Sequence, residues 1–310
     1  MATPSQPRTA KKPATSSFDL ADYLETRTTA VNGALDRLLP KASVRPPTIH
    51  KAMRYSLFAG GKRIRPALVL AAAEACGGPI DAALPAAAAV ECIHTYSLIH
   101  DDLPAMDNDD FRRGKPTNHK VFGEGIAVLA GDALLTAAFD IIAQAPERKR
   151  YPVSLQVREL AHAAGSLHLI AGQVADLEGE GQKLTVPQLR YIHERKTSAL
   201  LCASVRLGGM SANCTAAQLE ALTDFGYHVG LAFQVIDDIL DVTQTSEKLG
   251  KTAGKDVAAE KATYPSIVGL DKSRKIAKQL TQKAFAALAP FKSNAPALHA
   301  IAEYLLRRDC

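Results

Sequence analysis

From residue 19 onward, apolar residues recur with the 3.6-residue period of an α-helix along nearly the whole chain. Glycine and proline residues interrupt this pattern at intervals, and no series of short β-branched segments alternates with it. A parallel-sheet fold therefore has no support, and we predict an all-α, single-domain bundle of about ten or more helices. The predicted helices cover residues 20–39, 47–59, 66–76, 82–103, 119–144, 154–178, 187–207, 216–243, 271–288 and 295–308.

The composition fits a soluble domain with a closely packed core. Of the 310 residues, 47% are hydrophobic and 22% are charged, whereas aromatic residues make up 5% and tryptophan is absent. Such a core favours alanine-rich helices that approach each other closely. We predict that residues 19–310 form one domain. Residues 1–18, rich in Ser, Thr and Pro and free of acidic residues, are predicted to form a disordered tail, with a transit peptide as the alternative.

The net charge of +5 is not concentrated on the predicted domain. Residues 1–18 contribute three basic residues and no acidic one, so the rest of the chain carries an excess of only two positive charges. A protein that binds nucleic acid through its folded domain concentrates positive charge there. We therefore expect no nucleic-acid partner.

The five cysteines are odd in number and form no CxxC pair, which indicates reduced, mostly buried thiols in a cytosolic protein. The first residues lack the apolar centre of a secretory signal. Glu74, Glu91 and two aspartate clusters interrupt the long apolar stretches, so we expect no membrane-spanning helix and no stable membrane insertion. Together these features predict a cytoplasmic protein.

Two short clusters of aspartates interrupt apolar helical stretches. The second cluster contains Asp237, Asp238 and Asp241. On a helix, Asp237 and Asp241 lie about 40° apart, on one face and one turn from each other. Like charges at this spacing repel each other, and burial adds a desolvation cost. A positively charged group is therefore expected beside them.

The first cluster, Asp101, Asp102 and Asp107, does not follow a helical period. Pro104 is unfavourable inside a helix, so we predict that the helix ends there and that the chain folds back to bring Asp107 toward Asp101. Clusters built from carboxylates favour Mg²⁺, which completes its shell with water and substrate phosphates. Two solvated acidic helix ends are the alternative interpretation.

Basic residues lie close to these aspartates in the sequence. Arg112 and Arg113 follow the first cluster directly. The planar guanidinium group of arginine can bind two phosphate oxygens at once, and the ammonium group of lysine acts as a point charge. Each basic group alone is typical of a solvated surface, but together with two magnesium-type clusters they indicate diphosphate substrates. The other members of this set are Lys62, Arg63, Arg65, Lys196, Lys251, Lys255 and Lys261.

These motifs resemble those of the short-chain trans-isoprenyl diphosphate synthases, and the chain is most similar to the bacterial farnesyl diphosphate synthases and their geranylgeranyl relatives. The resemblance covers residues 47–270 and, more loosely, the C-terminal helices. One departure is Glu260 before Lys261, where many members have glycine. The motifs are GGKRIRP at 60–66, HTYSLIHDDLPAMDNDDFRRGKPTNH at 94–119, LAGDALL at 129–135, KT at 196–197, FQVIDDILD at 233–241, GKTAGKD at 250–256 and EKATYP at 260–265.

The resemblance implies a helix bundle around a central cavity. There, isopentenyl diphosphate would condense head to tail with dimethylallyl and geranyl diphosphate, releasing diphosphate. It implies three Mg²⁺ ions, with Mn²⁺ as an alternative, held by Asp101, Asp102 and Asp107 on one wall and by Asp237 and Asp241 on the other. The allylic diphosphate would be bound by Arg112, Lys196, Lys251 and Lys261, and isopentenyl diphosphate by Lys62, Arg65, His94 and Arg113. The implied catalytic residues are Lys196, Thr197 and Gln234.

In this family the residues just before the first aspartate cluster limit the length of the product. Tyr96 is five residues before Asp101 and Ser97 is four, which places Tyr96 about 7.5 Å along the helix. A ring there would block elongation, and the insertion at Pro104 and Ala105 also resembles the bacterial farnesyl synthases. We therefore expect (2E,6E)-farnesyl diphosphate, a C15 product. A C20 product, geranylgeranyl diphosphate, and a purely structural role for Tyr96 are the alternatives.

Two other protein classes fit fewer of these features. A terpene cyclase usually carries an Asn/Ser/Glu metal motif in place of the second aspartate cluster, and it does not need the basic set for isopentenyl diphosphate. A noncatalytic subunit tends to lose one aspartate motif, and both are intact here. The family is commonly homodimeric, so the resemblance also implies a homodimer. His100 and His119 are expected to be structural.

Overall fold

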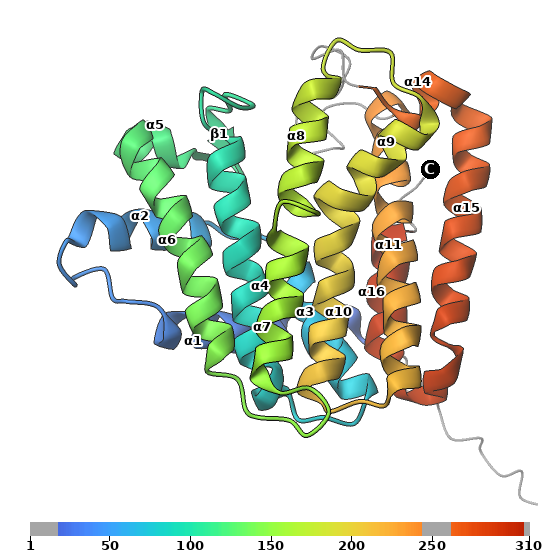
Figure 1. Cartoon of the computed structure of the whole chain (residues 1–310), viewed down its shortest axis with the longest axis horizontal. Helices are drawn as coiled ribbons and strands as arrows, with labels where there is room; N and C mark the ends of the chain where they lie inside the picture. The colour runs from blue at the N-terminus through green and yellow to red at the C-terminus, as the bar shows by residue number, and fades with distance from the viewer. Residues whose placement is uncertain (1–17, 244–261, 307–310) are drawn as a thin grey trace, which may run out of the picture.

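The computed structural model describes residues 18–243 and 262–306, and its long elements are all α-helices (Figure 1). The all-α fold predicted from the sequence is confirmed. The first half holds α1 (Leu20–Leu38), α2 (Pro47–Leu57), α3 (Ile64–Ala75), α4 (Ile80–Asp101), α5 (Asn118–Phe122) and α6 (Glu124–Ala143). The second half holds α7 (Val153–Ala164), α8 (Leu169–Gly179), α9 (Val186–His193), η1 (Glu194–Ser198), α10 (Ala199–Ser211), α11 (Ala216–Thr243), α14 (Tyr264–Val268), α15 (Leu270–Ala287), η2 (Ala289–Asn294) and α16 (Pro296–Leu306).

Two of the predicted helices are each divided in two. The segment predicted at 119–144 breaks at Gly123, which adopts a φ of 84° that few residues other than glycine tolerate, and so forms α5 and α6. The segment predicted at 154–178 breaks where Gly165 turns to an extended conformation after α7. In both places the hydrophobic period continues across the break, which is why the pattern alone did not show it.

The centre of the bundle is built from small residues. Ala86, Ala87, Ala88 and Ala89 of α4 are all fully buried. α10 packs so closely on α3 that a Cβ placed on Gly208 would lie 2.1 Å from the backbone oxygen of Val69. This close approach of backbones explains how the core can form with so few aromatic residues.

Two helices contradict the expectation that no apolar stretch reaches the length of a membrane span. By length and composition alone, α4 and α6 are long and apolar enough to cross a bilayer. The apolar stretch of α4 is 72% buried within the protein, as expected for the central helix of a core, and that of α6 is 39% buried. The expectation failed because few charges interrupt these stretches, and Glu91 of α4 is neutralised by an internal partner.

A two-stranded hairpin follows α4 at the end of the bundle where α4 and α11 finish (Figure 1). It pairs β1 (Phe111–Arg112) with β2 (Lys115–Pro116) in antiparallel register, with Arg112 opposite Lys115. The two turn residues, Arg113 and Gly114, have φ values of 54° and 74°, the left-handed conformation of a tight hairpin turn. The hairpin therefore holds Arg112 and Arg113 on a short, rigid frame.

Candidate active site

The first aspartate cluster lies where α4 ends and the chain reverses. After Asp101 the chain turns, so that the Asp107 backbone N–H donates to the Asp101 carbonyl oxygen at 2.8 Å and Met106 N–H donates to the Leu103 carbonyl at 2.9 Å. This confirms the predicted fold-back that follows from Pro104. The backbones of the first and third aspartates are thus adjacent, although six residues separate them.

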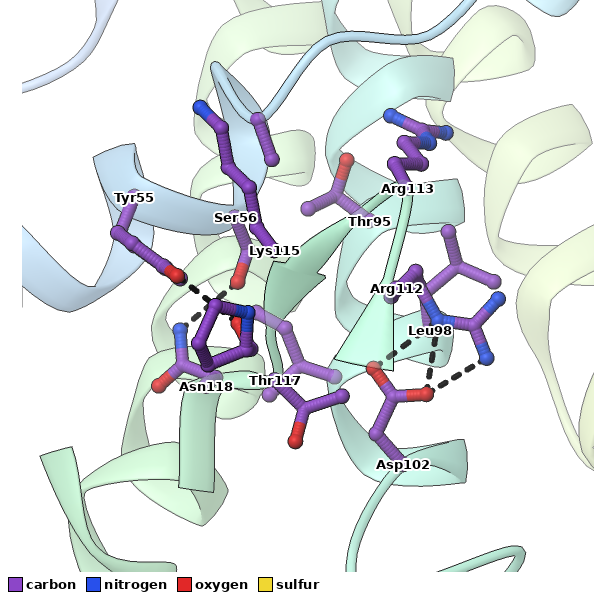
Figure 2. Close-up of a pocket in the computed structure, with 13 residues that line it drawn as sticks. Tyr55, Ser56, Thr95, Leu98, Asp102, Arg112, Arg113, Lys115, Thr117 and Asn118 are labelled. Carbon is purple, nitrogen blue, oxygen red and sulfur yellow. Dashed lines mark hydrogen bonds and ion pairs between the residues drawn. The ribbon is translucent and has the colours of Figure 1, made fainter. Parts of the chain in front are cut away.

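The second aspartate of this cluster is bound to the hairpin. Arg112 Nε donates to both carboxylate oxygens of Asp102, at 2.7 and 3.0 Å, and Nη2 lies 2.6 Å from Oδ1 (Figure 2). The Asp102 side chain is only 5% exposed. Because the Arg112 guanidinium occupies both oxygens of the Asp102 carboxylate, we infer that Asp102 orients Arg112. The predicted metal-binding role of Asp102 stays a prediction.

Asp101 lies on the other side of the same helix end, beside a mostly apolar cavity. Burial, opposed by the charge of Lys196 and reinforced by that of Asp107, raises the pKa of Asp101 to about 6. A buried carboxyl whose ionised form is disfavoured in this way gains most from a cation. Carboxylate oxygens are the ligands that Mg²⁺ prefers, so the donor set fits this ion.

The cavity has a volume of about 550 Å³, within the usual range of small-molecule sites. Charged and polar groups form part of its wall, and apolar residues of α4, α6, α8 and α10 form much of the rest. Of the residues predicted from the sequence, those that line it are Arg65, His94, Tyr96, Ser97, Asp101, Lys196 and Thr197. Its apolar lining includes Leu103, Met106, Val128, Leu169, Ile170, Val174, Leu177 and Leu200.

Basic residues of α3, α4 and the hairpin lie near one another; Arg65 and His94 line this cavity, and Arg113 lies beside them. Arg65 Nη1 lies 3.4 Å from His94 Nε2, and burial followed by the charge of Arg65 lowers the pKa of His94 well below its usual value. Arg113 donates to the Gly60 carbonyl and occupies the space in which a side chain on Gly61 would stand. The structure thus brings together three of the four residues predicted to bind isopentenyl diphosphate.

The fourth residue of that set lies apart, and Arg65 has spare binding capacity. Lys62 Nζ stands 4.9 Å from the centre of the Tyr304 ring on α16. Arg65 Nε is buried and has no hydrogen-bond partner among the described residues, and burial lowers the pKa of this guanidinium. A buried cation with an unused donor favours an anionic ligand.

A buried ion pair supports this basic group, and the sequence analysis missed its role. Arg63 has a left-handed φ of 48° that turns its side chain inward, where Nη1 contacts Glu91 at 2.5 Å and Nε donates to Asn32 at 3.2 Å. Its other nitrogen donates to the Leu57 carbonyl. The Arg63 and Glu91 side chains are 3% and 2% exposed. The only signal in the sequence was a lone glutamate inside an apolar helix.

Lys196 and Thr197 lie in a π-helical turn, η1, between α9 and α10. Such turns are uncommon and are frequent at functional sites. Gly172 of α8 packs directly on this turn, since a Cβ there would lie 2.1 Å from the Lys196 backbone nitrogen. Lys196 Nζ is 2.7 Å from Asp176 Oδ2, also on α8. Asp176 and the cavity-lining Gln173 were not predicted from the sequence.

The second aspartate cluster lies inside α11. Asp237 is half-buried and Asp241 is buried, whereas Asp238 accepts a hydrogen bond of 2.8 Å from the backbone N–H of Tyr264. Gln234 is half-buried one turn earlier. None of these residues lines the 550 Å³ cavity. The predicted Lys251 and Lys261 lie outside the described residues.

Over residues 18–243 and 262–306, no three or more His, Cys, Asp or Glu side chains form a group able to hold a metal ion by themselves. A Mg²⁺ ion commonly takes only one or two protein carboxylates and completes its shell with water and substrate phosphates. The two aspartate clusters therefore fit ions shared between protein and substrate.

Comparison with known proteins assigns this site to a family. The sequence model of the polyprenyl synthetases matches residues 46–296, which include both aspartate clusters and the Arg65 turn. The chain belongs to the polyprenyl synthetase family. It is a short-chain trans-prenyl diphosphate synthase, as the motifs predicted, and thus a prenyltransferase acting on prenyl diphosphates.

Individual polyprenyl synthetases resemble the chain over most of its length. It is 53% identical to the chloroplastic heterodimeric geranylgeranyl pyrophosphate synthase large subunit 1 of Arabidopsis thaliana, over 95% of this chain and 81% of that protein. It is 51% identical to the chloroplastic geranylgeranyl pyrophosphate synthase of Catharanthus roseus, over 95% of this chain and 83% of that protein. The chain also superposes on the crystal structure of a protein from Marinomonas sp. MED121 described as a farnesyl-diphosphate synthase, with a TM-score of 0.81 and 37% sequence identity. This match covers 93% of this chain and 99% of that one.

Proposed function

We propose that this chain condenses isopentenyl diphosphate with allylic diphosphates and that its main product is C20 geranylgeranyl diphosphate. The observation that carries the proposal is the cavity, whose lining combines Asp101, Lys196 and Arg65 with a largely apolar wall. This arrangement suits a molecule with a charged diphosphate head and a long hydrocarbon tail. The names of the two plant relatives favour C20 over the C15 product expected from the sequence.

In this proposal the residues of the chain divide the work between two diphosphates. Lys196 and Arg112 bind the allylic diphosphate, and Arg65, His94 and Arg113 bind isopentenyl diphosphate. Asp101 and Asp107 on one side and Asp237 and Asp241 on the other would hold Mg²⁺, which would supply positive charge to stabilise the departing diphosphate. The hydroxyl of Thr197 and the amide of Gln234 direct oxygen dipoles toward the cationic carbon. An alkene is the nucleophile, so no activated serine or cysteine is required.

Tyr96 and Ser97, the residues predicted to limit product length, line the cavity. The Tyr96 ring stands edge-on to His100, with ring centres 5.8 Å apart, and His100 Nε2 is 3.0 Å from the Val128 carbonyl of α6. Ser97 donates its hydroxyl hydrogen bond to the His94 carbonyl at 2.9 Å. Tyr96 therefore packs toward α6, as one lining residue among many, and we propose that a C20 chain passes beside it.

The test is to incubate purified protein with isopentenyl diphosphate, dimethylallyl diphosphate and Mg²⁺ and to separate the products by chain length. We expect C20 to dominate in the wild type and in Tyr96→Phe, which keeps the ring. A dominant C15 product would restore Tyr96 as the floor of the cavity, and Tyr96→Ala would then lengthen the product. Absence of any product with C5, C10 and C15 starters would indicate a subunit that needs a catalytic partner.

We also propose a homodimer, because α6 and α8 expose apolar side chains on the surface beside the cavity. Leu129 is 54% exposed, and Val128, Ile170 and Val174 are between 40% and 46% exposed although they also line the cavity. A second copy covering this surface would close the hydrocarbon wall. The Arabidopsis relative is named as the subunit of a heterodimer, so light scattering of the purified protein must distinguish a homodimer from a monomer that needs another chain.

The cytoplasmic location remains a proposal, which imaging of a full-length fluorescent fusion would test.

A further inference from the structure

Two cysteines meet at the end of the bundle opposite to the diphosphate end. Cys76 is the C-terminal cap of α3, whose first turn carries Arg65, and Cys214 follows α10, whose first residues adjoin Thr197. Eleven helical residues separate Arg65 from Cys76, a distance of about 16 Å. This site is therefore separate from the proposed chemistry, and the inference below does not depend on the proposed function.

The two segments are in direct contact. A Cβ placed on Gly78, just after Cys76, would lie 2.4 Å from the Cβ of Ala212, just before Cys214. Cys76 and Ala212 both pack against the buried apolar cluster that contains Cys214. Cys214 is 3% exposed, and Cys76 is half-buried and so open to small solutes. Two thiols from segments far apart in the sequence thus stand together.

The surroundings of Cys214 favour its thiolate. Its sulfur lies 3.9 Å from the Tyr151 hydroxyl, and Arg150 is anchored beside it by a hydrogen bond of 3.0 Å from Nη1 to the Asn213 carbonyl. The neighbouring Cys76 thiol, helped by Tyr151 and Arg150 and opposed by burial, lowers the pKa of Cys214 to about 7. A thiolate with a second thiol in contact has the arrangement of a reactive and a resolving cysteine.

We propose that Cys76 and Cys214 form an intramolecular disulfide when the protein meets a peroxide. The Cys214 thiolate attacks one peroxide oxygen, the O–O bond breaks, and hydroxide leaves as a sulfenic acid forms. The Cys76 thiol then attacks the Cys214 sulfur and releases water. Two thiols and one hydrogen peroxide thus give one disulfide and two waters.

The disulfide joins the far ends of two helices that already pack along their length. It restricts the unfolded chain between residues 76 and 214 and so stabilises the folded protein. We expect the thermal midpoint to rise by ~5 °C. Prenyl transfer should stay within about twofold, because the packed α3 and α10 have little freedom to shift.

The experiment uses the reduced full-length protein, treated with one to five equivalents of hydrogen peroxide and then alkylated. Peptide mapping without reductant should find the Cys76 and Cys214 peptides joined, with a loss of two hydrogens. The matched controls Cys92→Ser and Cys202→Ser should form the same link. Cys76→Ser should lack it and should instead retain a sulfenic acid on Cys214 that dimedone traps.

Several outcomes would overturn the proposal. They are full alkylation of Cys76 and Cys214 after peroxide, a link to Cys92, Cys202 or Cys310 instead, or a disulfide only between two chains. The wild-type peptide map decides the matter even if a serine variant folds poorly, since it needs no substitution. A rise in the thermal midpoint that persists in Cys76→Ser would separate any stabilisation from this disulfide.

Discussion

The two aspartate clusters have similar sequences, but the backbone brings their side chains together in different ways. In the first, α4 ends at Asp101 and a reversed loop returns Asp107, with its N–H bonded to the Asp101 carbonyl. In the second, Asp237 and Asp241 come from consecutive turns of the uninterrupted helix α11. Helical periodicity alone arranges the second cluster, whereas the first depends on a proline and a loop.

The clusters share one feature that their sequences do not show. In each, the second aspartate already has a protein partner: Asp102 binds the Arg112 guanidinium, and Asp238 accepts the Tyr264 backbone N–H. These contacts come from elements later in the chain, the hairpin in one case and α14 in the other. We propose that adjacent aspartates divide their roles: the second joins neighbouring elements, and the first, which lines the cavity in the case of Asp101, contributes to metal binding.

The largest effect should come from neutralising the first aspartate of either cluster. We expect Asp101→Asn and Asp237→Asn each to lower kcat by about 10³-fold, because an amide holds a cation far more weakly than a carboxylate and the departing diphosphate loses its stabilisation. Steady-state kinetics over a range of Mg²⁺ concentrations measure this, and the Mg²⁺ requirement should rise as well.

The matched variants are Asp102→Asn and Asp238→Asn. In Asp238→Asn the side-chain amide retains an oxygen that accepts from the Tyr264 N–H, so we expect about tenfold losses or less and an unchanged Mg²⁺ requirement. Equal losses for first and second aspartates would show that the proposed division of roles does not exist.

An intermediate effect is expected when the Asp102 partner is removed. Arg112→Ala leaves a nearly buried carboxylate without its counter-charge, and we expect the free energy of unfolding to fall by about 2 kcal/mol. The nearby Lys120–Asp110 pair is the control, because its Nζ–Oδ1 distance is also short, at 2.7 Å, while its side chains are 45% and 61% exposed. Lys120→Ala should leave the urea unfolding midpoint essentially unchanged, because water screens an exposed pair. Similar costs for the two pairs would contradict the structural role of Asp102.

The smallest effect concerns the stability of the metal-free protein. The folded state raises the pKa of Asp101 to about 6, so between about pH 4 and 6 the folded protein holds more protons than the unfolded chain, and stability falls as pH rises. In EDTA, Asp101→Asn should therefore increase the free energy of unfolding by about 1 kcal/mol at pH 7.5 and by less at pH 5. Urea unfolding at both pH values measures this. If Asp101→Asn were less stable than the wild type at pH 7.5, the ionised Asp101 carboxylate would not be destabilising in the metal-free protein.

Much of the fold and part of the site could be predicted from local sequence. The helical period, the break at Pro104 and the family motifs all depend on residues close together in the chain. The Arg63–Glu91 and Lys196–Asp176 pairs could not be predicted, because each joins different helices. The different roles of Asp101 and Asp102 were also hidden, since only the position of the hairpin decides which carboxylate meets Arg112.

The π-helical turn at Glu194–Ser198 has a consequence for how this chain tolerates insertions and deletions. It places one more residue in a turn than an α-helix does, so all of α10 is rotated by about 100° relative to an uninterrupted continuation of α9. Removal of one residue from this turn would restore a regular helix. The lost residue and the lost bulge would shift the phase by about 100° in opposite senses, so Leu200 and the Gly208 contact face would keep their orientation. Removal of a residue within α10, where no bulge absorbs the change, would instead rotate every later residue of that helix by about 100°.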